Sequence, residues 1–279
     1  MTANERKINN QWARKGAGSG GHIRWPLLWV VLILGLLPLS GVAETPNARN
    51  TRAAAMAARD YTEAQARWQQ NRTNTDLAWK YGRACFDAGE FAGHDSYRAH
   101  LAEQGIEACR EALRYNPLSA PAHYYLALNM GQKARSDKLG ALKLVREMET
   151  ELKTAIALDP KLDYGGPDRS LGLLYRDAPG WPTSIGSKRK AREHLTLATQ
   201  IAPDYPENWL NLVAACLHWQ EKDKARELLP VVSQKLQIAR QKFTGPEWEW
   251  NWLDWERRWE KIKAKLDYKE PLSVHAERK

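Results

Sequence analysis

The fold is decided by the stretch Tyr164-Gly165-Gly166-Pro167-Asp168-Arg169-Ser170-Leu171-Gly172-Leu173-Leu174-Tyr175, which opens a unit that ends at Pro203. Leu171, Gly172 and Tyr175 fall on one side of a helix. The glycine on that side lets a second helix approach closely. The helix that follows carries a small-large-small stripe at Ala191, Leu195 and Ala198, and Pro203 ends it. The stretch therefore predicts two antiparallel helices that pack through small residues.

The same landmarks recur at a regular interval. Three prolines that end second helices, Pro117, Pro160 and Pro203, lie 43 residues apart. Three small residues of first helices, Gly82, Ala127 and Gly172, lie 45 apart. A repeat of this kind, with one small-residue stripe per helix, is typical of an α-solenoid. We therefore expect an all-α fold, an α-solenoid of about four helical hairpins over residues 73–232 with a C-terminal capping helix.

The last unit shows a familiar spacing. Its landmarks after Pro203 are Trp209, Leu212, Cys216, Ala225 and Leu229. These residues, with the stripes of the earlier units, resemble the tetratricopeptide (TPR) family. The TPR repeat is shorter, so we expect about nine extra residues per earlier unit in the hairpin connections. The resemblance implies a superhelix in which the first helix of each hairpin lines the concave side.

The quoted stretch carries a more specific resemblance. It is followed by Ala178-Pro179-Gly180, an Ile185-Gly186-Ser187 turn and a helix with Lys190-Ala191-Arg192-Glu193-His194-Leu195. Together these look like the T-component proteins of periplasmic TRAP transporters. That resemblance implies an oligomer, a substrate-binding P component as partner and a cleft for a hydrophobic acid. The regulator of microtubule dynamics proteins share a similar style of cryptic repeat. The residues taken as the repeat signature are Gly82, Ala127, Gly165, Gly166, Pro167, Gly172, Ala191 and Ala198.

The N-terminal part predicts export from the cytoplasm. Residues 1–24 are polar and basic, and residues 25–43 are uncharged and mostly apolar. The apolar run is either a cleaved signal peptide or a retained anchor in the inner membrane. Both place the remaining chain in the periplasm or cell envelope. Relatives of the T component are expected to be lipoproteins, but the run Leu39-Ser40-Gly41 is followed by Val42, which cannot be lipidated.

The rest of the chain divides into four further parts. We expect a leading helix in residues 44–72, the repeats in 73–232, Trp-rich capping helices in 233–270 and a disordered tail in 271–279. Four tryptophans, Trp248, Trp252, Trp255 and Trp259, share one helical face. That face either covers the exposed apolar side of the last repeat or forms an aromatic belt for a ligand or membrane. Trp250 points elsewhere, which makes it a candidate for an exposed contact.

Charge and cysteine content exclude some classes of function. The net charge is +9, but basic and acidic side chains alternate along the helices, as in residues 189–193. Because a nucleic-acid surface needs a basic stripe with exposed aromatics, we expect no nucleic-acid partner. Cys85 and Cys109 occupy packing positions in the first hairpin and either form a disulfide or remain buried thiols.

No motif predicts catalysis. His94, Asp95 and His100 share one connection, but their spacing matches no tight metal-binding pattern. Gly165-Gly166 follows no predicted strand, so we interpret it as the turn that begins a helix rather than a phosphate loop. We therefore expect no enzyme activity, no metal and no cofactor.

The predicted binding surface lies beside the packing stripe on the first helices. Its residues are Trp79, Arg83, Phe86, Tyr124, Leu128, Arg169, Leu173, Arg176, Leu210, Ala214 and Leu217. Arg83, Arg169 and Arg176 in an apolar groove would suit a ligand with an apolar body and an anionic head. Alternatively, the apolar residues are core and the arginines reach solvent.

Two functions follow as hypotheses. The first is an exported, non-enzymatic TPR-like binding protein, a TRAP-transporter accessory component that binds a hydrophobic carboxylate and a partner protein or peptide. The second is a general cell-envelope scaffold for protein assembly with no small ligand. The exposed ends of a short solenoid also allow a homo-oligomer.

Overall fold

The structure is a computed structural model that describes residues 46–136 and 140–269. The predicted polar region 1–24, the apolar run 25–43 and the tail 271–279 lie outside the described residues. Among the described helices, none is long and apolar enough to cross a membrane.

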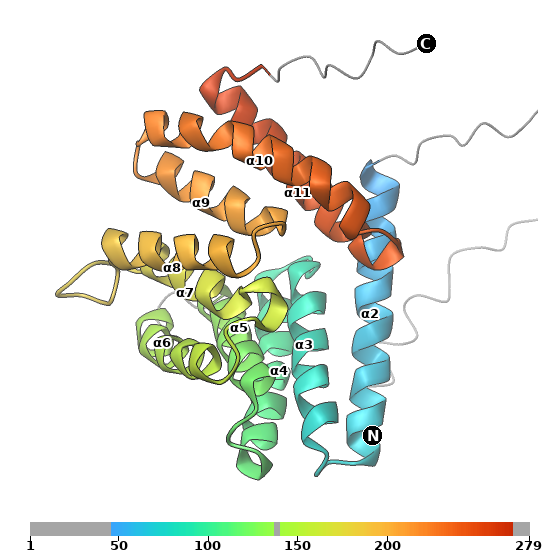
Figure 1. Cartoon of the computed structure of the whole chain (residues 1–279). Coiled ribbons are helices and arrows are strands. Elements are labelled where there is room, and N and C mark those ends of the chain that lie inside the picture. The colour runs from blue at the N-terminus through green and yellow to red at the C-terminus, as the bar shows by residue number, and fades with distance from the viewer. Residues whose placement is uncertain (1–45, 137–139, 270–279) are drawn as a thin grey trace, which may run out of the picture. The chain divides into compact units, whose positions relative to one another are not determined.

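The described residues form ten α-helices and two short 3-10 helices (Figure 1). The elements in chain order are α2 (Pro46–Gln70), α3 (Thr75–Glu90), α4 (Asp95–Tyr115), α5 (Ala120–Ser136), α6 (Ala141–Leu158), η1 (Leu162–Tyr164), α7 (Gly166–Asp177), α8 (Lys188–Ile201), α9 (Pro206–His218), α10 (Lys222–Lys242), η2 (Pro246–Trp248) and α11 (Glu249–Leu266).

The helices pack in consecutive pairs. The pairs α3 with α4, α5 with α6, α7 with α8 and α9 with α10 form four hairpins, and α2 packs on α3 as a leading helix. The first helices also contact one another, α3 with α5, α5 with α7 and α7 with α9. We call these four the inner helices, and α4, α6, α8 and α10 the outer helices. This arrangement confirms the predicted all-α solenoid of helical hairpins.

Small residues hold the third hairpin together as predicted. A Cβ atom at Gly172 would lie 2.7 Å from Cγ and 3.0 Å from the backbone nitrogen of Leu195. Because these distances are far below van der Waals contact, only glycine permits the observed approach of α7 to α8. Ala191, Leu195 and Ala198 on α8 are fully buried.

Helices α3, α4 and α8 begin after residues whose side chains accept a backbone N–H. Asn74 caps α3 by accepting from the backbone nitrogen of Leu77 at 3.0 Å. His94 caps α4 by accepting from the Tyr97 nitrogen at 3.2 Å, and Ser187 caps α8. Such caps satisfy backbone donors that would otherwise have no partner.

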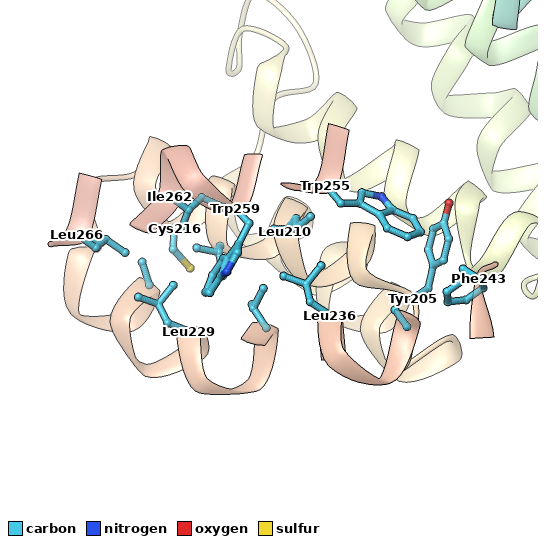
Figure 2. Packing of buried hydrophobic residues seen from close by; sticks show 14 residues of the cluster. Tyr205, Leu210, Cys216, Leu229, Leu236, Phe243, Trp255, Trp259, Ile262 and Leu266 are labelled. Atoms are coloured by element: carbon cyan, nitrogen blue, oxygen red, sulfur yellow. The ribbon is translucent and has the colours of Figure 1, made fainter. Parts of the chain in front are cut away.

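The C-terminal helix covers the last hairpin (Figure 2). Trp255 and Trp259 of α11 are buried against Leu210, Cys216 and Leu229 of the α9–α10 hairpin. Trp248 and Trp252 pack partly buried on the same cluster, as the predicted capping face requires. Helix α10 continues to Lys242, so residues 233–242 belong to the last hairpin rather than to the cap.

Helix α11 also contacts the leading helix α2. Arg52 of α2 forms a 2.9 Å ion pair with Glu249. The ring of Trp250 lies against that of Phe91, which follows α3, with 4.6 Å between the ring centroids. Trp250, expected to make an exposed contact, therefore joins the two ends of the repeat region.

All three cysteines are buried free thiols. Burial raises the pKa of the Cys85 thiol to about 12 and that of Cys109 further. A protonated thiol is a weak nucleophile. Of the two alternatives for Cys85 and Cys109, the structure shows the unbonded one.

Candidate functional site

A tight turn places the first residues of α7. Asp163, Tyr164 and Gly165 have left-handed backbone conformations in succession, with φ of 48°, 57° and 78°. Such conformations are costly for residues other than glycine and persist where the surroundings hold them. Here the Asp163 carboxylate accepts a 2.8 Å hydrogen bond from the hydroxyl of Tyr124 and a 2.7 Å bond from Arg169.

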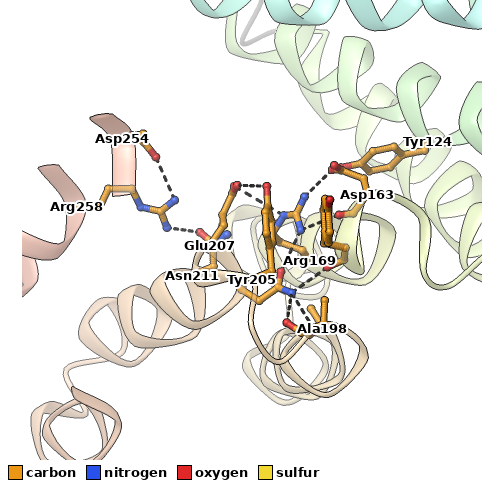
Figure 3. A network of polar contacts seen from close by, with 12 residues as sticks. Tyr124, Asp163, Arg169, Ala198, Tyr205, Glu207, Asn211, Asp254 and Arg258 are labelled. Atoms are coloured by element: carbon orange, nitrogen blue, oxygen red, sulfur yellow. Dashed lines mark hydrogen bonds and ion pairs between the residues drawn. The ribbon is translucent and has the colours of Figure 1, made fainter. Parts of the chain in front are cut away.

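Arg169 lies at the centre of this buried polar network (Figure 3). Its guanidinium also donates to the backbone oxygen of Asp163 at 3.2 Å and to Oδ1 of Asn208 at 3.0 Å. Glu207 lies 3.7 Å away, and the ring of Tyr205 lies under the guanidinium. Arg169 is only 5% exposed.

Asn208 completes the network. Its Nδ2 donates to the backbone oxygens of Tyr164 and Ala198, both at 2.9 Å. The network thus joins α5, η1, α7, α8 and α9. Because its donors are used inside the protein, Arg169 is a structural residue, and this corrects the expectation that its guanidinium faces a groove.

Beside the network lies a cavity of about 390 Å³, which we call the aromatic pocket. Its walls come from α3, α5, the segment around η1, the residue that precedes α9, η2 and the start of α11. The lining residues are Trp79, Arg83, Tyr125, Leu162, Asp163, Tyr164, Tyr205, Glu247, Trp248 and Asn251. Two stacked ring pairs shape it, Trp79 with Tyr125 at 6.0 Å and Tyr164 with Tyr205 at 4.6 Å between centroids.

Arg83 is the cation of the aromatic pocket. It forms a 3.4 Å ion pair with Asp87 one turn along α3, and both side chains remain about half exposed. Desolvation by the surrounding protein raises the pKa of the Asp87 carboxyl to about 6; Arg83 opposes this shift and the nearby Asp163 charge adds to it. The pocket therefore holds an arginine whose ion-pair partner is a carboxyl with a raised pKa.

A second cavity, of about 380 Å³, lies between α7, α9 and α11, and we call it the cationic pocket. The lining residues are Arg176, Ala214, Leu217, His218, Arg258, Lys261, Ile262 and Lys265. Arg176 donates twice to its neighbour Asp177, at 2.6 and 2.8 Å. Arg258 donates to Asn211 at 2.6 Å and to Asp254 at 3.4 Å (Figure 3).

The structure divides the predicted groove residues into separate settings. Trp79 and Arg83 line the aromatic pocket, whereas Arg176, Ala214 and Leu217 line the cationic pocket. Tyr124, Arg169 and Leu210 are buried. Phe86, Leu128 and Leu173 are partly buried on the inner helices and line neither pocket. The three arginines thus do not form one site.

The repeat-signature residues are packing positions. Buried throughout, they are Gly82, Ala127, Gly165, Gly166, Pro167, Gly172, Ala191 and Ala198. Gly165 precedes α7 and Pro167 lies in its first turn, as expected for the turn that begins a helix. No group of three His, Cys, Asp or Glu that could hold a metal occurs among the described residues.

Several residues of these sites were not predicted. Asp163 and Asn208 carry the buried network, but Asp163 meets Tyr124, and Asn208 meets Arg169, from 39 residues away in the chain, so no local pattern indicated the network. Lys261 and Lys265 line the cationic pocket. Their spacing from Arg258 by three and seven residues places all three cations on one face of a helix. This spacing could have indicated a cationic face, but the helix was interpreted from its tryptophans alone.

The hairpins, the contacts between inner helices and the capping helix define a TPR-like helical repeat protein. The family described as "Regulator of microtubule dynamics protein 1-3" has a sequence model that matches residues 47–164. TTC0263, a thermophilic TPR protein in Thermus thermophilus, is 16% identical, with 79% of this chain and 100% of that chain covered and a TM-score of 0.55. MamA is 18% identical, with 71% and 98% covered and a TM-score of 0.47. Comparison with curated proteins found no match.

Proposed function

We propose that the chain is a non-enzymatic, TPR-like scaffold that holds a segment of a partner protein on its inner helices. The observation that carries this proposal is the presence of two pockets on the inner helices, one aromatic and one cationic. Helical repeat proteins offer such surfaces for extended partners. The pocket sizes lie within the range of binding clefts.

Site-specific photocrosslinking tests the use of the inner face. Benzoylphenylalanine is placed at Leu173 or Leu217 on inner helices, and at Leu142 or Leu197 on outer helices as controls. Leu142 and Leu197 are 45% and 38% exposed, so the probe reaches solvent there. We expect one partner species cross-linked from the inner positions and absent from the outer ones. Equal cross-linking from both faces, or only from the outer face, would contradict the proposal.

A hydrophobic carboxylate is a second candidate, favoured by the aromatic pocket. The rings of Trp79 and Tyr125 offer an apolar wall, and Arg83 offers a fork of donors for a carboxylate. Titration with phenylacetate and octanoate, followed by tryptophan fluorescence, tests it. We expect Arg83→Gln to weaken binding about tenfold and the exposed Arg59→Gln control to leave it unchanged. Absence of binding, or equal binding by both variants, would leave the scaffold without a small ligand.

The proposal also includes export of the chain from the cytoplasm and its association with a TRAP transporter. Their support is the apolar run 25–43 and the resemblance of the segment after Tyr164 to T components. Expression in a bacterium with fractionation, followed by mass measurement of the N-terminus, tests location and cleavage. Co-elution with a substrate-binding P component would support the TRAP association. Failure to associate would favour the general envelope scaffold.

A further inference from the structure

The cationic pocket contains an imbalance of charge. Its eight lining residues include four permanent cations, one histidine and no carboxylate. Two of the cations already have partners, since Arg176 is bonded to Asp177 and Arg258 is bonded to Asp254. The charge that remains unbalanced therefore lies on the other two cations, the lysines of α11.

That charge belongs to Lys261 and Lys265. Both side chains are exposed, and neither forms an ion pair within the described part of the chain. The floor between the cations is apolar, formed by Ala214, Leu217 and Ile262. Ile262 is anchored in the cluster that fixes α11 on the last hairpin (Figure 2), so the lysines project from a supported helix.

The spacing of the two lysines indicates the form of the ligand. Four residues of an α-helix rise about 6 Å, which is the separation along α11 of the backbone positions that carry the two lysines. In an extended chain, side chains two residues apart lie on the same side and about 6.6 Å apart. Two carboxylates at that separation can each meet one lysine, whereas a small acid with one anionic head can pair with one.

We propose that the cationic pocket binds an extended acidic segment of a partner protein, with two acidic residues separated by one residue and an aliphatic side chain on the apolar floor. The proposal rests on the proposed function, because it names the partner chemistry of the inner face. A recess with an apolar floor suits a peptide better than it suits a flat anionic surface such as a membrane.

Fluorescence anisotropy of the full chain tests the proposal. The probe is the fluorescein-labelled peptide Ser-Glu-Leu-Glu-Ser, and the control peptide carries Gln in place of Glu. We expect saturable binding of the acidic peptide that weakens as salt is raised, and none of the control peptide. Lys261→Gln with Lys265→Gln should weaken binding at least about tenfold.

A matched variant controls for the loss of two charges. Lys143→Gln with Lys222→Gln removes two exposed lysines from the outer helices α6 and α10 and should leave the affinity unchanged. Equal weakening in both double variants would show a general charge effect and overturn the proposal. So would binding of the control peptide with the same affinity.

The outcomes separate this inference from the function on which it rests. Cross-linking from Leu217 without binding of the acidic peptide would overturn the inference and leave the inner-face scaffold standing. Lysine-dependent binding to vesicles of phosphatidylglycerol and phosphatidylcholine, without binding of the peptide, would assign the pocket to a membrane surface and likewise overturn it. Peptide binding without inner-face cross-links would mean that the natural partner uses another surface, and it would contradict the proposed function.

Discussion

Helix α7 carries an arginine at each end, and the two arginines lie in different surroundings. Arg169 in the first turn of α7 is 5% exposed and is bonded to Asp163 and Asn208 from other segments. Arg176 in the last turn is bonded to its own neighbour, Asp177, and lines the cationic pocket. Helical position alone puts both on the inner side. The comparison teaches that availability to a ligand depends on which distant residues meet each guanidinium.

The largest effect should come from Arg169→Ala. The substitution leaves the Asp163 carboxylate without its ion-pair partner and the buried Oδ1 of Asn208 without its donor. Breaking a buried ion pair from one side is strongly destabilising, so we expect a loss of about 2 to 4 kcal/mol in the free energy of unfolding. Urea denaturation measures it.

A double substitution distinguishes the contribution of the Arg169–Asp163 ion pair from that of the packing around it. Arg169→Ala with Asp163→Ala removes both charges and should cost less than the sum of the two single substitutions. Unchanged stability in Arg169→Ala would remove the distinction between the two ends of α7 and restore Arg169 as a candidate for ligand binding.

Gly172→Leu tests the packing of α7 on α8 at a position between the two arginines in the sequence. A Cβ at this position already meets Leu195 at 2.7 Å, and its backbone nitrogen at 3.0 Å. We expect a loss of roughly 1 to 3 kcal/mol or more, because the backbone of α8 must move. Thermal unfolding followed by circular dichroism measures the loss. Ala178→Leu, at a partly buried position after α7, is the control and should cost much less. An unchanged melting temperature for Gly172→Leu would contradict the observed pairing of α7 with α8.

The sequence was sufficient for the hairpins but not for the role of each arginine. Gly172 and Leu195 could be paired because helix periodicity and a repeated interval determine which faces meet. The burial of Arg169 could not be predicted, because it depends on Asn208, 39 residues away, and on a left-handed turn at Asp163. Lys261 and Lys265 were missed for a related reason. The cavity that they line arises only where α11 lies beside α7 and α9.

A pH titration extends the comparison to Arg83, the third predicted arginine. The folded protein raises the pKa of its partner Asp87 to about 6, above the value of about 4 in an unfolded chain. Between these values the folded state binds more protons, so this group makes the protein less stable as pH rises from about 4 to 6. Asp87→Asn lacks the titration and should therefore be more stable than the unaltered chain at pH 7.

The stability difference should shrink as the pH falls and vanish near pH 4. Since the Asp87 side chain is 46% exposed, we expect less than about 1 kcal/mol at pH 7. Urea denaturation of both proteins across this range provides the measurement, with Asp177→Asn as the control for an exposed acid that pairs with an arginine. A stability difference that stays constant, or grows toward low pH, would show that the pKa of Asp87 is not raised. The pair of Arg83 with Asp87 would then be an ordinary surface ion pair.

The smallest effect on stability should come from Arg176→Ala, and that is what makes it informative. Its hydrogen bonds go to an adjacent residue whose side chain is 56% exposed, so their loss leaves no buried charge behind. We expect a change within about 0.5 kcal/mol, in contrast to Arg169→Ala on the same helix. Because Arg176 lines the cationic pocket, the same substitution should weaken binding of the acidic peptide, measured by anisotropy. A destabilised Arg176→Ala would mean that both ends of α7 are structural, whereas a stable variant with unchanged binding would restrict the peptide contact to α11.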